Sequence, residues 1–132
     1  MSGVPPTRRQ TIEQQRARFA LGRVREVASK KYGGKYRQEV QGLPAMILTN
    51  GLGQTLAFLR AKSKGGRADD EHAAAYQHLC SWICLQMGWT GDLLERVTAT
   101  DVAGYRRAQL EALAVLGWLK RFAEAELPEA GT

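Results

Sequence analysis

Two cysteines and two histidines are the side chains of this sequence that most readily bind a metal. Cys80 and Cys84 lie one helical turn apart, and His72 and His78 precede them. A structural zinc site normally adds a second pair of ligands from elsewhere in the chain. Cys80 falls in an apolar stripe, where a free cysteine packs as a small hydrophobic residue. We therefore predict that both thiols belong to the core and that the chain has neither a metal site nor a cofactor.

Residue patterns typical of catalysis are not discernible. The two histidines are six positions apart, which places them on different faces of one predicted helix. No Ser/His/Asp set or distinct carboxylate pair stands out. Residues 50–54, Asn-Gly-Leu-Gly-Gln, faintly resemble a phosphate loop but lack the Gly-Lys-Ser/Thr ending, and no strand precedes them. We predict no enzymatic activity and interpret Gly51 and Gly53 as sites of close helix packing.

Basic side chains form the strongest functional pattern. One edge of the first predicted helix carries Arg9, Arg16, Arg23 and Lys30, spaced seven residues apart. Roughly opposite them lie Arg18 and Arg25, and further basic residues follow at Lys62, Arg67, Lys120 and Arg121. Guanidinium groups spaced along a helix suit successive phosphates, because each donates two parallel hydrogen bonds. The pattern favours contact with nucleic acid over the alternative, a solvated face that keeps the protein soluble.

Three tryptophans could stack on bases. We interpret Trp82 as a core or interface anchor, since it lies beside an apolar stripe. Trp118 and Phe122 are one turn apart at the edge of another stripe and are predicted to form a protein interface.

The elements that carry these residues are all predicted to be helices. Apolar residues recur at steps of three and four, and no stretch alternates as a strand does. Long helices are predicted from Thr7 or Thr11 to about Lys31, from Pro44 to about Ser63, from Asp69 or Asp70 to Met87, and from Asp101 to about Leu127. Short helices are predicted at 35–41, closed by Gly42, and at 92–97. The fold class is therefore all-α, a compact bundle of four long helices plus one or two short ones.

The length of 132 residues indicates one domain. We expect a flexible N-terminal tail at 1–7, a single all-helical domain at 8–127 and a C-terminal tail at 128–132. The net charge of +6 is unevenly distributed, with 14 basic and 3 acidic residues up to residue 68 and 5 basic and 10 acidic residues after it. This division suggests a polyanion partner on one side and a protein surface on the other.

The length of the apolar runs and the number of cysteines exclude several classes of protein. No apolar run approaches the length needed to span a bilayer, and the N-terminus lacks the apolar stretch of a secretory signal. Two cysteines do not make a disulfide framework. The expected location is the cytoplasm, without membrane association.

Four segments carry a family resemblance. They are Thr11-Ile12-Glu13-Gln14 leading to Arg16 and Phe19-Ala20, the block from Leu43 to Leu59 leading to Lys62, Asp70-Glu71-His72 with Tyr76, His78 and Trp82, and Glu111-Ala112 with Trp118 to Ala123. Together they resemble the small subunit of the Cmr complex, the type III-B CRISPR effector of antiviral defence. The resemblance covers about residues 11–127, and its most specific part is Pro44 to Leu52. Residues 64–68 and 88–104 match no motif of the family.

The resemblance implies an all-helical, non-catalytic subunit. In complexes of this family several copies stack as a short inner filament beside ferredoxin-like backbone subunits that hold the guide RNA, and the resemblance implies the same arrangement here. The implied partners are those backbone subunits, the large subunit, further copies of this chain, the guide RNA and the target RNA. Sequence would be read by base pairing with the guide, so this subunit need only hold a phosphate backbone.

The basic pattern and the resemblance together predict the contact residues. Contact with RNA is predicted for Arg16, Arg23, Arg25 and Lys62, and further for Arg18, Arg67, Lys120 and Arg121. Subunit contact is predicted for Trp118 and Phe122. Two alternatives remain open. One is a purely structural adaptor whose basic face meets acidic protein, and the other is a free-standing DNA-binding protein, although no helix–turn–helix is evident.

Overall fold

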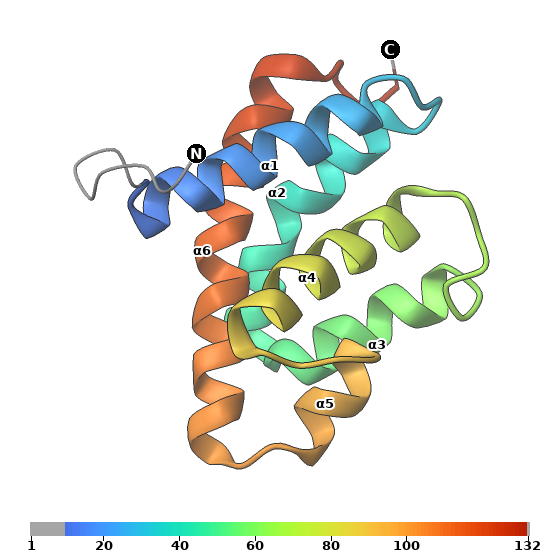
Figure 1. Cartoon of the computed structure of the whole chain (residues 1–132). Helices are drawn as coiled ribbons and strands as arrows, with labels where there is room; N and C mark the ends of the chain where they lie inside the picture. Colours follow the sequence, from blue (N-terminus) through green and yellow to red (C-terminus); the bar gives the residue numbers. More distant parts are fainter. Residues whose placement is uncertain (1–9, 132) are drawn as a thin grey trace.

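The structure, a computed structural model, describes residues 10–131 and confirms the all-α class. No strand occurs among the described residues. The six helices are α1 (Ile12–Val27), α2 (Gly33–Asn50), α3 (Leu52–Lys62), α4 (Glu71–Met87), α5 (Leu93–Ala99) and α6 (Val102–Glu126) (Figure 1). Within this part of the chain, no helix is both long and apolar enough to cross a membrane. The expected tail at 1–7 lies outside the described residues.

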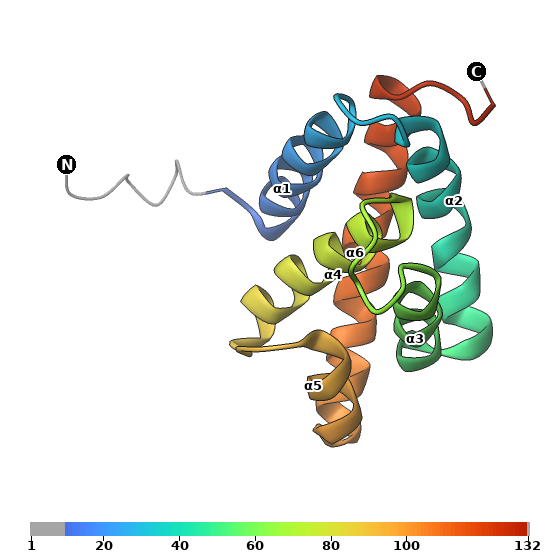
Figure 2. The same ribbon diagram turned by 90° about the vertical axis from the view of Figure 1, so that its right-hand side faces the viewer.

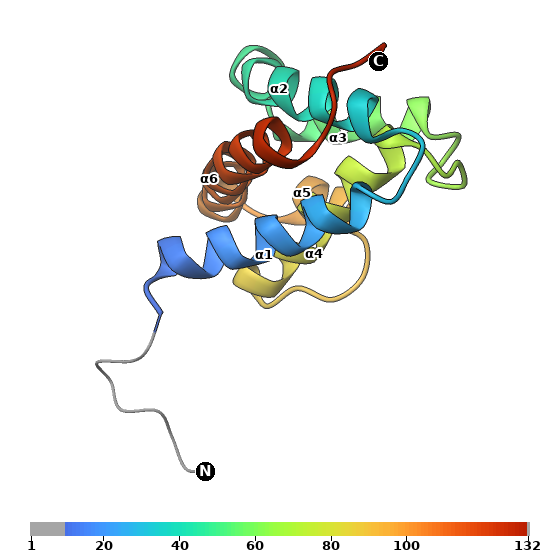
Figure 3. The same cartoon turned by 90° about the horizontal axis from the view of Figure 1, so that it is seen from above.

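The longest helix, α6, is the axis of the bundle. It contacts α1, α2 and α4. Figure 2 shows α1 on one side of α6 and α2 on the other, and Figure 3 shows the same separation from above. The last helix, α6, therefore packs between α1 and α2, which both come from the first part of the sequence. α3 and α5 close the end of the bundle near the start of α6 (Figure 1).

Helix starts follow the capping residues of the sequence. Thr11 accepts a hydrogen bond from the backbone N–H of Gln14, whose side chain in turn accepts from the N–H of Thr11. Asp70, Asp92 and Asp101 each accept from a backbone N–H three residues later. Such side chains satisfy amides that have no partner inside the helix. The predicted starts at Thr11, Asp70 and Asp101 are confirmed.

The division of residues 33–62 was predicted wrongly. The expected short helix at 35–41 and long helix at 44–63 are a long helix, α2, followed by a short one, α3. Pro44 lies inside α2 rather than opening a helix. Val40, Leu43 and Ile47 are buried on either side of it, and their packing keeps the helix continuous although the proline provides no N–H.

The chain breaks instead at Gly51, where φ is +87° and a side chain is strained. A Cβ at Gly51 would lie 3.0 Å from Tyr105 Oη. Tyr105 Oη also accepts a hydrogen bond from the N–H of Gly53 at 2.9 Å, and Gln109 Oε1 accepts from the N–H of Leu52 at 2.9 Å. Residues 50–54 are thus a helix junction held on α6, and the prediction of close packing there is confirmed.

The first helix ends earlier than predicted, at Val27 rather than near Lys31. Gly33 and Gly34, expected to end it, form the first turn of α2. A Cβ at Gly34 would lie 2.8 Å from the carbonyl oxygen of Glu129. Because Gly34 has no side chain, the C-terminal segment can lie close to its backbone. Residues 129–130 of the expected tail therefore pack on the start of α2.

The junction at Gly51 is tested by alanine substitution. Gly51→Ala should lower the free energy of unfolding by about 1–3 kcal/mol, because the left-handed backbone and Tyr105 both oppose a Cβ. Gly42→Ala, at an open position inside α2, should raise it by roughly 0.5–1 kcal/mol. Urea unfolding measures both. If Gly42→Ala were the destabilising change, the helix would end where the sequence pattern placed its end.

Candidate nucleic-acid interface

The predicted RNA-contact residues fall into three groups according to their partners in the structure. The first contains only Arg16, whose side chain is 14% exposed. Its guanidinium donates to Glu111 on α6, with Nη2 3.0 Å from Oε2, and also pairs with Glu13 one turn earlier on α1. Hydrogen bonding to Glu111 raises the pKa of Arg16. Two carboxylates neutralise this arginine inside the protein, so we assign it a structural role.

Glu111 is the centre of a polar contact between three helices. Besides Arg16 of α1, it accepts a hydrogen bond at 2.9 Å from Nε1 of Trp82 on α4. The Glu111 side chain is 13% exposed. A carboxylate this enclosed is stable in its charged form only with donors of this kind. We call Arg16, Trp82 and Glu111 the three-helix clamp.

Trp118 connects α6 to α1 at a second point. Its Nε1 donates at 3.0 Å to Oε1 of Glu13, and this bond, followed by that from Arg16, lowers the pKa of Glu13. The Trp118 ring stacks on Phe122 with 5.7 Å between centroids. Both rings are partly exposed and pack on the core. Their predicted role in subunit contact stays a prediction.

A second group of arginines has one carboxylate partner each. The pairs are Arg23 with Glu26 at 3.1 Å, Arg25 with Glu126 at 3.0 Å and Arg121 with Glu124 at 3.5 Å. Arg23 also lies over the ring of Phe19. Exposed pairs of this type contribute little to stability and are screened by salt. Arg25 and Arg121 are the most exposed of the three, at 62% and 76%.

The third group comprises Arg18, Lys62, Arg67 and Lys120. None of them has a carboxylate oxygen within 4.0 Å in residues 10–131, where the ion pairs involve other cations. Arg18, Lys62 and Arg67 are exposed, and Lys120 is partly exposed. Lys62 Nζ lies 5.8 Å from the centroid of the Phe58 ring. These four cations are therefore the predicted contacts whose charge no carboxylate of residues 10–131 compensates.

Two loops bring further cations to the neighbourhood of Lys62 and Arg67. Lys30 Nζ lies 3.9 Å from Asp69, which joins the loop between α1 and α2 to the loop between α3 and α4 (Figure 2). We call five exposed basic residues of these two loops and the adjoining helix ends the loop-end cluster: Lys31, Lys35, Lys62, Lys64 and Arg67. Lys31, Lys35 and Lys64 add charge close to the predicted contacts in the sequence but were not themselves predicted to bind RNA. Runs of lysine beside glycine in a loop were the available signal.

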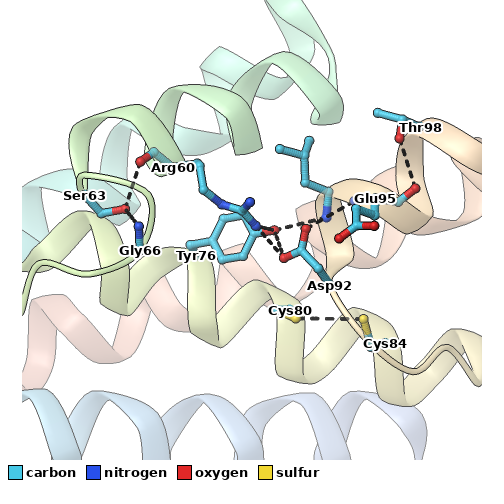
Figure 4. A network of polar contacts seen from close by, with 10 residues as sticks. Arg60, Ser63, Gly66, Tyr76, Cys80, Cys84, Asp92, Glu95 and Thr98 are labelled. Carbon is cyan, nitrogen blue, oxygen red and sulfur yellow. Dashed lines mark hydrogen bonds and ion pairs between the residues drawn. The ribbon is translucent and has the colours of Figure 1, made fainter.

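Arg60 takes no part in this surface, because it binds inside the protein. Its guanidinium donates to Tyr76 Oη at 2.6 Å and pairs with Asp92, while Tyr76 donates to Asp92 at 2.6 Å (Figure 4). Tyr76 Oη also accepts from the N–H of Leu94. Burial, and then the bond to Asp92, raises the pKa of Tyr76. The network attaches α5 to α3 and α4.

The residues first considered for zinc do not converge. Cys80 Sγ and Cys84 Sγ are 3.9 Å apart on α4 beside this network (Figure 4). Burial raises the pKa of the Cys84 thiol to about 12, so it stays protonated. His78 is buried and its Nδ1 lies 2.6 Å from Tyr36 Oη, in a hydrogen bond. His72 contacts Glu39 and Glu71 instead of the thiols. The core position of Cys84 is confirmed, and Cys80 is partly buried against the same core.

The fold and these sequence segments agree with the comparisons. The family described as CRISPR-associated protein (Cas_Cmr5) matches residues 12–126. A CRISPR system Cmr subunit Cmr5 from Thermus thermophilus is 30% identical over 115 residues, which cover 86% of this chain and 93% of that protein. One from Thermotoga maritima is 34% identical over 117 residues, covering 89% and 85%.

A solved structure gives the same result in three dimensions. The crystal structure of a CRISPR-associated Cmr5 family protein from Thermus thermophilus superposes with a TM-score of 0.74 at 31% identity, covering 90% of this chain and all of that one. The fold and the sequence comparisons thus define a small, all-helical CRISPR-associated protein. The chain belongs to the Cas_Cmr5 family, which confirms the resemblance carried by its sequence segments.

The three-helix clamp is tested by removing one charge. Glu111→Gln should lower the free energy of unfolding by about 2 kcal/mol, because the enclosed Arg16 loses its main counter-charge. Glu124→Gln removes the same charge from an exposed pair and should change it by no more than about 0.5 kcal/mol. Equal effects of the two substitutions in urea unfolding would contradict the assignment.

Because His78 is buried, the stability of the fold should depend on pH. Burial, and then the charge of Arg23, lowers its pKa from 6.5 to about 4. The unfolded chain therefore binds this proton more readily than the folded one. The stabilisation of the fold that depends on a neutral His78 is therefore complete above about pH 6.5 and is lost as the pH falls to about 4.

Between pH 7 and pH 4 the free energy of unfolding should fall by about 3 kcal/mol more in the unaltered chain than in His78→Gln, which has no imidazole to protonate. The measurement is urea unfolding of both proteins between pH 7 and pH 4. Parallel stability curves for the two proteins would show that His78 is not held neutral by the fold.

Proposed function

We propose that this protein is a non-catalytic small subunit of a type III-B Cmr complex, which targets RNA under the direction of a guide RNA in antiviral defence. Membership of the Cas_Cmr5 family supports this role, and so do two relatives named as subunits of the Cmr system. The partners are the large subunit, the ferredoxin-like backbone subunits and further copies of this chain stacked as an inner filament. The complex works in the cytoplasm.

Within the complex, the subunit helps to hold the target RNA along the guide through its basic surface. The observation that carries this proposal is that four of the predicted contact residues, Arg18, Lys62, Arg67 and Lys120, have no carboxylate partner among residues 10–131. Arg23, Arg25 and Arg121 join them, since each would give up only a weak surface pair. Contacts of this kind fix a phosphate backbone without reading sequence.

The loop-end cluster adds three lysines, Lys31, Lys35 and Lys64, to the predicted contacts Lys62 and Arg67. All five side chains are exposed, and the contact of Lys30 with Asp69 connects the two loops that carry most of them. Neighbouring cations repel one another unless an anion lies between them. A nucleic acid strand supplies such anions at regular spacing.

Apolar side chains suit the remaining surface to protein contact. Leu110 and Val102 on α6 are 61% and 77% exposed, and Leu48 on α2 is 70% exposed. Trp118 and Phe122 lie further along α6. Interfaces concentrate aromatic and aliphatic groups of this kind, and the filament contacts would use them.

The salt dependence of RNA binding tests the phosphate contacts. If four phosphates are neutralised, the logarithm of the affinity for single-stranded RNA should fall with the logarithm of salt at a slope of about −3. Lys62→Gln and Arg67→Gln should each reduce the steepness of the slope by about 0.7. Fluorescence anisotropy with a labelled RNA measures it.

Two control variants define the outcome. Arg106→Gln removes an exposed charge near the start of α6, at the opposite end of the bundle from the loop between α1 and α2 (Figure 1), and Arg16→Gln removes one from the clamp. Neither should alter the slope. An affinity independent of salt, or unchanged slopes in the Lys62 and Arg67 variants, would contradict the proposal.

The structural adaptor remains the alternative, and reconstitution separates it from RNA contact. The combined substitutions Arg18→Glu, Lys62→Glu and Arg67→Glu should leave assembly of the complex intact and weaken binding of the target RNA. An adaptor whose basic face meets acidic protein would instead fail to assemble.

A further inference from the structure

Helices α2 and α4 bring together three side chains that the proposed function does not use. Glu39 of α2 has Oε1 3.1 Å from Nδ1 of His72, and Glu71 has Oε2 3.3 Å from Nε2 of the same imidazole. One ligand atom from each of the three residues lies within 4.8 Å of the other two. All three side chains are largely enclosed, with exposures of 13%, 17% and 20% for Glu39, Glu71 and His72.

The contact between His72 and Glu39 is not a hydrogen bond. Nδ1 of His72 is buried and has no hydrogen-bond partner among the described residues, although Glu39 Oε1 is only 3.1 Å away. The carboxylate oxygen therefore lies away from the direction of an N–H bond. Two ligands at about 2.0–2.1 Å from a tetrahedral zinc ion are about 3.3 Å apart and face the ion rather than each other. The pair has the spacing of two ligands of one ion.

The charge at this position also favours a cation. The carboxylates of Glu39 and Glu71 flank His72, and one ligand atom from each lies within 4.8 Å of the other and of an imidazole nitrogen. A divalent ion would balance both carboxylates, whereas a protonated His72 would balance only one.

A cavity of about 450 Å³ opens beside the three ligands. Lys35, Gln38, Met46 and Phe58 are among the residues that line it. The ring of Phe58 meets His72 edge-on, with 6.1 Å between centroids, and this contact orients the imidazole. The cavity leaves room for water in a fourth coordination position, as in zinc sites with three protein ligands.

We propose that Glu39, Glu71 and one nitrogen of His72 form a site for a divalent transition-metal ion, with zinc preferred, that ties α2 to the first turn of α4. A donor set of one imidazole and two carboxylates suits zinc better than magnesium or calcium, which take oxygen ligands. The ion would fix the α4 end of the loop at 63–70. It would therefore stabilise the fold beside the loop-end cluster.

The site is tested by titrating zinc into the full chain after removal of metals with a chelator. Calorimetry should find one equivalent of zinc, and binding should weaken at least tenfold in Glu39→Gln and in His72→Gln. At a zinc concentration of about 100 times the dissociation constant, the melting temperature of the unaltered chain should rise by about 10 °C, and that of the two variants should not.

Matched variants make every result decisive. Cys80→Ser with Cys84→Ser removes the thiols, and Glu124→Gln removes an exposed carboxylate, so both proteins should still bind one equivalent. Circular dichroism before titration establishes that each variant is folded. The proposal is overturned if folded wild-type protein binds no equivalent of zinc, or if folded Glu39→Gln or folded His72→Gln binds zinc as tightly as the wild type.

Discussion

The carboxylate of Glu111 is the contact on which the arrangement of the bundle depends. It projects from the central helix α6 and accepts hydrogen bonds from Arg16 of α1 and Trp82 of α4. Leucine and alanine side chains fill the core around it, but they provide contact area without direction. The clamp fixes which faces of α1 and α4 meet α6. It therefore also determines which faces of α1 remain in solvent.

That constraint divides the basic residues of the first half of the sequence. The basic residues spaced seven apart on α1 do not all face solvent, because α1 crosses α6 at an angle (Figure 1). Arg16 lies at the crossing and is neutralised by Glu111 and Glu13, whereas Arg18 and the loop-end cluster face solvent. The acidic second half of the chain likewise supplies internal partners, since Glu111, Glu126 and Asp92 each bind an arginine from the first half. The uneven charge of the sequence is partly a pattern of internal pairing.

Much of the fold could be predicted, because its signals are local. Thr11, Asp70 and Asp101 start helices for reasons contained within three residues. The junction at Gly51 could not be placed, because Pro44 and Gly42 are stronger local signals for a boundary and are overruled by burial of Val40 and Ile47. Arg16 was assigned to the surface for a similar reason, since Glu111 lies 95 residues away. The contact between Glu39 and His72 could not be predicted either, because no residue near one of them in the sequence indicates that the other lies beside it.

The three-helix clamp withdraws Arg16 from the surface, and the RNA contact that we propose falls to the other basic residues. The most direct measurement is mass spectrometry of arginine modification by a dicarbonyl reagent, in the assembled complex with and without target RNA. Arg18 and Arg67 should react without RNA and be protected by it, while Arg16 should stay unmodified in both states. Rapid modification of Arg16 that target RNA suppresses, with Arg18 and Arg67 unaffected, would contradict the proposal.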